Sequence, residues 1–285
     1  MTGFMDEENR ADKEAIDSST RAFEVQYPMR ARLLFSTWIA MAVATTANVS
    51  SASPPAPSRS AAEPKFTTGP KAWTLATTAQ LSYANGSCRD MLPPEVRADS
   101  NAASTRRLLH DWWGVDSRSD LLQTLDRLDG GGGHRTVFQE KGRVYAAMTE
   151  AQFQAALRAA AKQPENVRRM KLVRGYYAKH RDNSFLGWDY CRYIMLCRWG
   201  YQVGFLSQDE AWARMIPAAR RIQSSFHSWA ELGEDYLAGR ELWSPQETAR
   251  TGKYYREVGA WLVKEPGGPW TRLPWSMDLG VAASR

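Results

Sequence analysis

The sequence has few of the residues that build metal sites and disulfide frameworks, with four His and three Cys among 285 residues. Three Cys in a chain of this length exclude a disulfide-stapled miniprotein. No two His stand at the spacing of a metal-binding pair, so we expect neither a metal site nor a cofactor. The sequence also lacks a nucleotide-binding loop and a catalytic-triad motif. It therefore does not identify a reaction.

Apolar residues make up 43% of the chain and charged residues 24%, which is enough for a folded core and excludes a wholly disordered chain. The charge is uneven. Residues 1–28 carry seven acids and three bases, residues 29–53 add two bases, and residues 54–285 carry the remaining net +8 of a chain total of +6. A basic domain favours acidic partners such as nucleic acid, anionic lipid or a cell-wall polymer. The alternative, which we favour, is a solubilising charge spread over the surface.

Residues 29–52 have the pattern of a secretory signal peptide. Arg30 and Arg32 precede an uncharged apolar run from Leu33 to about Ala47, and small residues suited to cleavage after Ala47 or Ala52 follow. The run is shorter than the roughly 20 apolar residues of a usual spanning helix. An uncleaved membrane anchor over residues 33–49 remains the alternative. We therefore expect a periplasmic or secreted protein, or one anchored in the inner membrane with its domain outside the cytoplasm.

The rest of the chain divides into four further parts. Residues 1–28 are acidic and polar and form either a disordered extension or a mis-called start, because Met29 is the better start for a signal peptide. Residues 53–70 are a Pro/Ala/Ser-rich linker, residues 71–264 the folded domain, and residues 265–285 a Pro/Trp-rich tail.

The folded domain has the pattern of a mainly α-helical domain. Four capping-box signatures, a Ser or Thr three residues before Glu or Gln, mark helix starts at Thr149, Ser207, Ser228 and Ser244. Pro217 is predicted to kink or split its helix. Residues 136–147 alternate modestly and suggest one small β-hairpin around Lys141-Gly142. The predicted helices span 72–84, 103–113, 118–128, 150–162, 165–180, 187–202, 208–225, 229–242 and 246–263.

Twelve Trp is several times the usual share. Nine of them fall on or beside predicted helices. Each Trp buries a large area and needs a partner for its indole N–H, so we favour a Trp-rich core over a groove that stacks sugars or bases.

Two groups of residues could carry chemistry. His134 and Arg135 follow the Gly130–Gly133 run, where backbone can approach a ligand closely; the alternative is a flexible loop with a solvated His. Asp189 and Arg192 are three residues apart on the most apolar helix and therefore share one face. That pair either ties helices together or lines a polar pocket.

Other stretches carry weaker signals. Trp229, Leu232 and Tyr236 follow helical spacing and indicate core, with Arg240 on the same helix. Cys191 and Cys197 cannot bond to each other, although one of them could pair with Cys88. The basic stretch 168–181, with Tyr interleaved, could bind nucleic acid, but more often such a stretch is a solvated helix face. We do not expect a nucleic-acid partner.

The motifs together resemble the bacterial domain-of-unknown-function family 1266, from about Trp73 to Trp243. The resemblance implies a bacterial, mostly helical domain and no established activity. The predicted export segment and the expanded Gly run before His134 depart from the family pattern. The motifs are Gly133-His134-Arg135, Trp188-Asp189-x-x-Arg192, Trp199-Gly200-x-x-x-Gly204, Glu210-Ala211-Trp212, Gln223-x-x-Phe226-x-Ser228-Trp229 and Tyr236-x-x-Gly239-Arg240-x-x-Trp243.

Two functions follow as hypotheses. The first is an exported interaction protein that binds a protein or an anionic envelope polymer. The alternative is an exported enzyme, a hydrolase or antibacterial toxin. Convergence of the candidate side chains in a helical pocket favours the enzyme, and an exposed His134 far from Asp189 favours the binder. The enzyme would use His134, Asp189 and Arg192 as catalytic residues and Arg135, Arg240, Trp188 and Trp229 to bind its ligand.

Overall fold

A computed structural model describes residues 67–84, 100–132 and 134–280. The predicted signal or anchor segment at 29–52, nearly all of the linker and Cys88 lie outside these residues, so the predictions made for them stay predictions. None of the described helices is both long and apolar enough to span a membrane.

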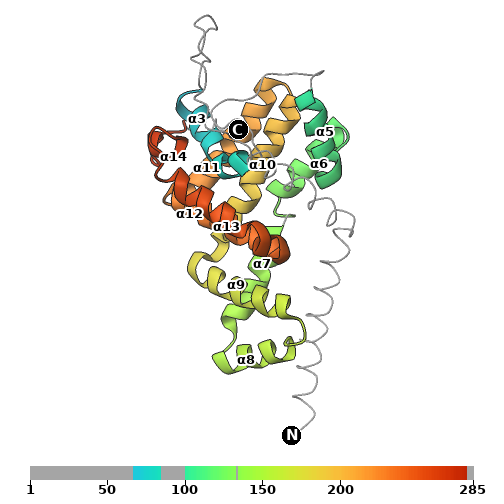
Figure 1. The fold of residues 1–285 in the computed structure, drawn as a ribbon, viewed down its shortest axis with the longest axis vertical. Helices are drawn as coiled ribbons and strands as arrows, with labels where there is room; N and C mark the ends of the chain where they lie inside the picture. The colour runs from blue at the N-terminus through green and yellow to red at the C-terminus, as the bar shows by residue number, and fades with distance from the viewer. Residues whose placement is uncertain (1–66, 85–99, 133, 281–285) are drawn as a thin grey trace, which may run out of the picture. The chain divides into compact units, whose positions relative to one another are not determined.

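The described residues form helices and no strand, so the prediction of a mainly α domain is confirmed (Figure 1). The helices are α3 (Gly69–Ala76), α4 (Ala79–Ala84), α5 (Ser100–Trp113), α6 (Arg118–Asp129), α7 (His134–Ala147), α8 (Glu150–Ala159), α9 (Pro164–His180), the 3₁₀ turn η1 (Arg181–Asn183), α10 (Leu186–Gln202), α11 (Gln208–Ser225), α12 (Trp229–Trp243), α13 (Pro245–Leu262) and α14 (Pro269–Arg272).

The β-hairpin predicted over 136–147 is wrong, because these residues belong to α7. Phe138 and Gly142, one helical turn apart, are both buried on the same side of the helix. A Cβ built on Gly142 would lie 2.5 Å from the Cβ of Tyr177 on α9. The glycine that suggested a turn lies where α7 and α9 pack against each other without room for a side chain.

Two other expectations need correction. Of the kink or split predicted at Pro217, the split is wrong, because α11 continues from Gln208 to Ser225 with the proline inside, and the kink stays a prediction. The helix predicted over 72–84 is divided into α3 and α4. Between them the hydroxyls of Thr77 and Thr78 donate to the carbonyls of Thr74 and Leu75, at 2.7 and 2.9 Å. Such local bonds compete with helix continuation.

Three of the four predicted capping signatures cap helix starts among the described residues. Thr149 and Ser207 form complete capping boxes with Gln152 and Glu210. The Ser228 hydroxyl accepts from the N–H of Glu231. Ser117, which the sequence analysis did not single out, forms another box with Asp120 at the start of α6. A side chain adjacent to the helix satisfies the first N–H groups in each case.

The core is built around α10, in which every residue from Leu186 to Tyr201 is buried. A helix that is buried all round must lie inside the domain. Helices α5, α6, α7, α11 and α12 surround it. Its polar residues are therefore buried with it, and Arg198 donates to the hydroxyls of Thr78 and Ser82 at 2.6 and 2.8 Å.

A cluster of Trp residues joins the two ends of the described domain. The Trp229 ring lies 4.6 Å from Trp73, 6.0 Å from Trp270 and 4.9 Å from Trp275, centroid to centroid. The indole of Trp270 donates to the carbonyl of Ala76 at 2.8 Å, so the segment after Lys264 packs onto α3. The preference for a Trp-rich core holds for this cluster, in which Trp73, Trp229 and Trp270 are buried.

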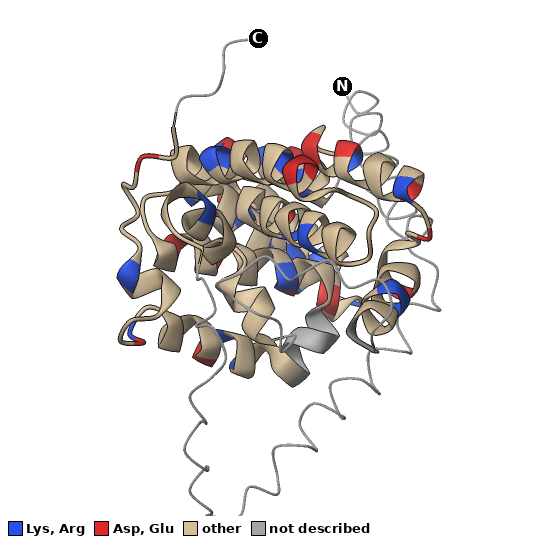
Figure 2. Cartoon of the chain, turned by 90° about the horizontal axis from the view of Figure 1, so that it is seen from above, with Lys and Arg blue, Asp and Glu red and all other residues tan. Residues whose placement is uncertain are grey.

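The charged residues are interspersed. Figure 2 shows acidic and basic residues along the same helices, with no single basic face in that view. Several bases of the 168–181 stretch are paired with acids from other helices, Arg168 with Glu241 and Arg174 with Glu150 at 2.7 Å, and Lys179 with Glu234 at 3.7 Å. These pairs agree with a solvated helix face.

Candidate functional site: a buried ion pair and an open cleft

Helix α7 begins directly after the glycine run, and the run shapes its start. Gly131 has a φ of 81°, a conformation that side chains disfavour. A Cβ there would lie 2.6 Å from the hydroxyl oxygen of Thr136 and 3.4 Å from Nη2 of Arg135. The Thr136 hydroxyl also donates to the carbonyl of Gly131. Glycine at this position lets the loop fold closely against the first turn of α7.

The first turn of α7 is joined to α10 by a buried carboxylate. Asp189, which is 0% exposed, accepts the N–H of Arg135 at 3.3 Å and forms an ion pair with Arg192. Burial raises the pKa of Asp189, while the charges of Arg192 and Arg135 act to lower it. Arg192 also donates to the carbonyl of Trp188 at 3.0 Å and lies over the Trp188 ring. Asp189 and Arg192 thus connect two helices, which is one of the two alternatives given for this pair in the sequence.

His134 lies in the interior and not on a solvated loop, with 6% of its surface exposed. Its Nδ1 lies 3.4 Å from Nη2 of Arg192. Arginine only donates hydrogen bonds, so Nδ1 is the acceptor and the proton of the neutral ring is on Nε2. Burial lowers the pKa of His134 well below its usual value, and nearby Arg192, Arg127 and Arg169 lower it further. The ring is therefore neutral at pH 7.

A second buried carboxylate, which could not be recognised in the sequence, caps the start of α10. Asp235 of α12 is 0% exposed and accepts the N–H groups of Phe185 and Trp188 at 2.7 and 3.0 Å. These donors belong to the first turn of α10, whose N-cap residue Phe185 offers no side-chain cap. Burial raises the pKa of Asp235 to about 7, against the backbone N–H groups and the Tyr176 hydroxyl that lower it. The sequence signal that could have identified Asp235 is its position three residues after Leu232, on the apolar stripe of a predicted core helix.

The structure brings four of the seven candidate residues together. His134, Arg135, Asp189 and Arg192 meet where α7 starts, and Trp188 contacts the group through Arg192.

Arg240 and Trp229 lie elsewhere. Arg240 donates to the Thr251 hydroxyl at 2.6 Å and lies over the Tyr255 ring. Trp229 donates to the carbonyl of Leu273 at 2.8 Å, inside the Trp cluster. These two residues serve the packing of α12 against α13 and the C-terminal segment.

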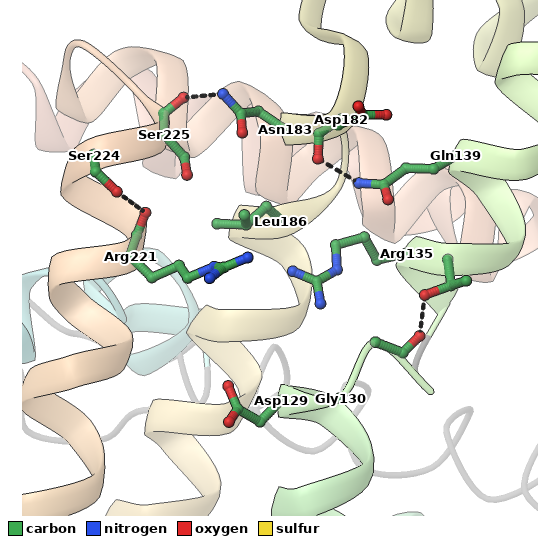
Figure 3. Close-up of a pocket in the computed structure, with 12 residues that line it drawn as sticks. Asp129, Gly130, Arg135, Gln139, Asp182, Asn183, Leu186, Arg221, Ser224 and Ser225 are labelled. Carbon is green, nitrogen blue, oxygen red and sulfur yellow. Dashed lines mark hydrogen bonds between the residues drawn. The ribbon is translucent and has the colours of Figure 1, made fainter. Parts of the chain in front are cut away.

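An open cleft of about 610 Å³ lies beside the buried group. Arg135 is the one member of that group that lines it. Figure 3 shows the side chains of Arg135 and Arg221 extending toward one another across Leu186. Arg221, on α11, carried no recognisable signal in the sequence. The cleft is lined by Asp129, Gly130, Gly131, Arg135, Thr136, Gln139, Asp182, Asn183, Leu186, Arg221, Ser224 and Ser225.

The uncharged rim of the cleft is held by internal hydrogen bonds. The Gln139 amide donates to the carbonyls of Asp182 and Ser184 at 2.7 and 2.9 Å. The Asn183 amide donates to the Ser225 carbonyl at 3.2 Å, and the Ser224 hydroxyl to the Arg221 carbonyl at 3.0 Å (Figure 3). The rim is thus organised before any ligand arrives.

The acidic residues of the lining have partners within the protein. Asp129 accepts the hydroxyl of Tyr190 at 2.8 Å, and Asp182 pairs with Arg143 at 3.2 Å. Tyr190 in turn lies under Arg135, whose guanidinium carbon is 5.3 Å from the ring centroid. Within the described part of the chain, neither Arg135 nor Arg221 forms an ion pair.

Two cysteines lie among the described residues. Cys191 and Cys197 are free and buried, and burial raises the pKa of both thiols. Where residues are described, no group of three or more His, Cys, Asp or Glu could hold a metal ion.

Comparison with known proteins identifies the family. The family described as "Protein of unknown function (DUF1266)" matches residues 108–275, more than half of the chain, and the protein belongs to it. The resemblance seen in the motifs is confirmed, with limits shifted toward the C-terminus: the match begins within α5 and extends past α14. No curated protein and no solved structure matches the chain.

Proposed function

We propose that this protein is exported and acts as a binding protein of the cell envelope, with the cleft between α7, α10 and α11 as its site for an anionic polymer. The observation that carries the proposal is the pair of arginines, Arg135 and Arg221, that face each other across the cleft and form no ion pair with the described residues. Guanidinium groups bind carboxylates and phosphates through several aligned N–H donors. The signal-like residues 29–52 support export.

The buried group supports binding rather than catalysis. Its side chains do converge, which is the arrangement we associated with an enzyme. However, they converge in the interior, and His134, Asp189 and Arg192 are absent from the lining of the cleft. A general acid or base must come within hydrogen-bond reach of its substrate. We infer that these three residues fix the start of α7 and thereby aim Arg135 into the cleft.

The test compares three forms of the full chain, expressed in their own host and fractionated: the parent, Arg221→Gln and Arg158→Gln. Arg158 is an exposed arginine on α8 that is not part of the cleft, so its variant controls for the loss of one positive charge. We expect the parent and Arg158→Gln to sediment with the envelope after loss of the N-terminal segment, as intact mass would show. We expect Arg221→Gln to be released without added salt, and salt to release the parent and Arg158→Gln.

Two results would overturn the proposal. An intact N-terminus on a cytoplasmic protein would overturn export. Envelope binding that does not change in Arg221→Gln would overturn the cleft as the binding site. Retention that is lost after protease treatment of the envelope would identify a protein partner in place of the polymer.

A further inference from the structure

We propose that the cleft recognises a doubly charged phosphate group, held between the guanidinium groups of Arg135 and Arg221. This inference rests on the proposed function and names the chemical group that the same site binds. It follows from the donors that the cleft leaves available, from the charge they carry and from the way Arg135 is held.

The charged donors in the lining of the cleft are the two arginines. The side-chain donors of Gln139, Asn183 and Ser224 are engaged with backbone carbonyls. The Thr136 hydroxyl is engaged in the same way, with Gly131. Arg135 and Arg221 come from different helices and point toward each other. A ligand between them must therefore present oxygens in two directions, as a tetrahedral oxyanion does.

The charge favours a dianion over a monoanion. Two guanidinium groups that face each other repel unless an anion lies between them. A carboxylate brings one negative charge, whereas a phosphate monoester near neutral pH brings close to two and three acceptor oxygens. The phosphate group therefore neutralises both arginines at once.

Arg135 is held in position before the ligand binds. Its guanidinium lies over Tyr190, and the hydroxyl of Tyr190 is fixed by Asp129 at 2.8 Å. On its other side, Nη2 would lie 3.4 Å from a Cβ on Gly131, so the glycine leaves room for it. Its own backbone N–H is held by Asp189. Because the side chain is already ordered, little conformational entropy is lost on binding.

A substitution of Asp129 should change phosphate binding in the opposite direction to Arg221→Gln. Its carboxylate lines the same cleft and repels an anion. Asp129→Asn keeps an acceptor for the Tyr190 hydroxyl and removes the charge. The proposal therefore requires weaker phosphate binding in Arg221→Gln and tighter binding in Asp129→Asn, with Arg158→Gln unchanged.

The experiment is a titration of the purified full chain with inorganic phosphate, sulfate and acetate at constant ionic strength, followed by ³¹P line broadening and by thermal stabilisation. We expect phosphate and sulfate to bind more tightly than acetate, and Arg221→Gln to weaken phosphate binding by roughly tenfold. Lowering the pH from about 7.5 to about 5.5 should weaken phosphate binding, because inorganic phosphate takes up a proton over this range and loses its second charge, and leave sulfate binding unchanged.

The outcomes separate this inference from the proposed function. Acetate that binds as tightly as phosphate, or phosphate binding that is the same in all variants, overturns the phosphate inference. Envelope binding that depends on Arg221 would survive that result and point to carboxylates. Phosphate that binds as expected, with no binding to the envelope, overturns the proposed function and leaves the phosphate site standing. Free phosphate and a polymer-linked phosphate are distinguished by whether inorganic phosphate releases the parent from the envelope.

Discussion

Two kinds of helix start occur in this domain. At α6, α8, α11 and α12 a Ser or Thr immediately before the helix accepts one of its first N–H groups, which we term a local cap. At α7 and α10 a buried carboxylate from another helix does so, which we term a distant cap. Local caps stabilise one helix each, whereas distant caps also fix how two helices lie against each other.

The two distant caps themselves differ. Asp189 has Arg192 as an ion-pair partner, and the start it caps lies beside the open cleft. Asp235 accepts from backbone N–H groups, and a tyrosine hydroxyl lies near it. Arginine therefore compensates one buried charge, while at the other only neutral donors oppose burial, and its pKa is raised to about 7. The predictions below separate these cases by the size of the effect.

The largest expected effect is the pH dependence of stability that Asp235 causes. Its folded pKa is about 7, whereas a carboxyl in the unfolded chain titrates near 4. Between these values the folded protein keeps a proton that the unfolded chain has lost. The free energy of unfolding therefore falls as the pH rises from about 4 to about 7, by on the order of 4 kcal/mol.

The matched variant is Asp235→Asn, which keeps an acceptor and cannot ionise. Urea unfolding of both proteins across this pH range isolates the contribution, since His134 and the other groups are common to them. We expect a difference that shrinks and then reverses as the pH rises. The same pH dependence in both proteins would remove Asp235 as its cause.

The next effect is at the other distant cap. Arg192→Ala leaves Asp189 buried without its ion-pair partner and should lower the free energy of unfolding by about 3 kcal/mol. The double variant Asp189→Asn with Arg192→Met removes the buried charge as well, and we expect it to regain a large part of the loss. Chemical denaturation at pH 7 measures both. A double variant less stable than Arg192→Ala would contradict the view that the charge, and not the packing, dominates.

A smaller change in stability is expected where α7 packs against α9, away from the capped start of α7. Gly142→Ala places a methyl group against the Cβ of Tyr177 and should cost about 2 kcal/mol through overpacking. The control is Gly175→Ala on α9, where a Cβ meets nothing within 4 Å. There we expect a gain of about 0.5–1 kcal/mol, because alanine favours the helix. Thermal unfolding of the two variants should give shifts of opposite sign.

The smallest effect is expected at a local cap. Ser117→Ala removes the hydroxyl that accepts the N–H of Asp120 and should cost about 1 kcal/mol. Its hydrogen-exchange signature should be confined to the first turn of α6. Spread of faster exchange into α10 would show that a local cap also fixes a neighbouring helix, and the distinction drawn above would fail.

The same distinction explains what could be predicted from the sequence. Local caps use residues three positions apart, so Thr149 and Ser207 were found and their helices begin as predicted. Distant caps join residues some 50 positions apart, such as Arg135 with Asp189 and Phe185 with Asp235. No periodicity contains that information. The turn predicted at Gly142 was wrong for a related reason. A glycine at a helix crossing and a glycine in a turn cannot be distinguished in the sequence without knowing the partner helix.

The candidate site was predicted in part for the same reason. Asp189 and Arg192 share a helix, and their spacing alone indicated a pair. That His134 would join them, and that Arg221 would face Arg135, depends on the packing of α7, α10 and α11. A residue such as Arg221, on an exposed helix face with no local motif, is found only when the neighbouring helices are in place.

The distant caps also imply an order of assembly. The first turn of α7 is completed only when α10 is present, and the first turn of α10 only when α12 supplies Asp235. The chain is synthesised from its N-terminus. The first turns of α7 and α10 are therefore completed only after a later helix has been synthesised. Nascent chains that end before Asp235 should therefore remain open to protease around α7 and α10, and the domain should close only once its C-terminal third has emerged.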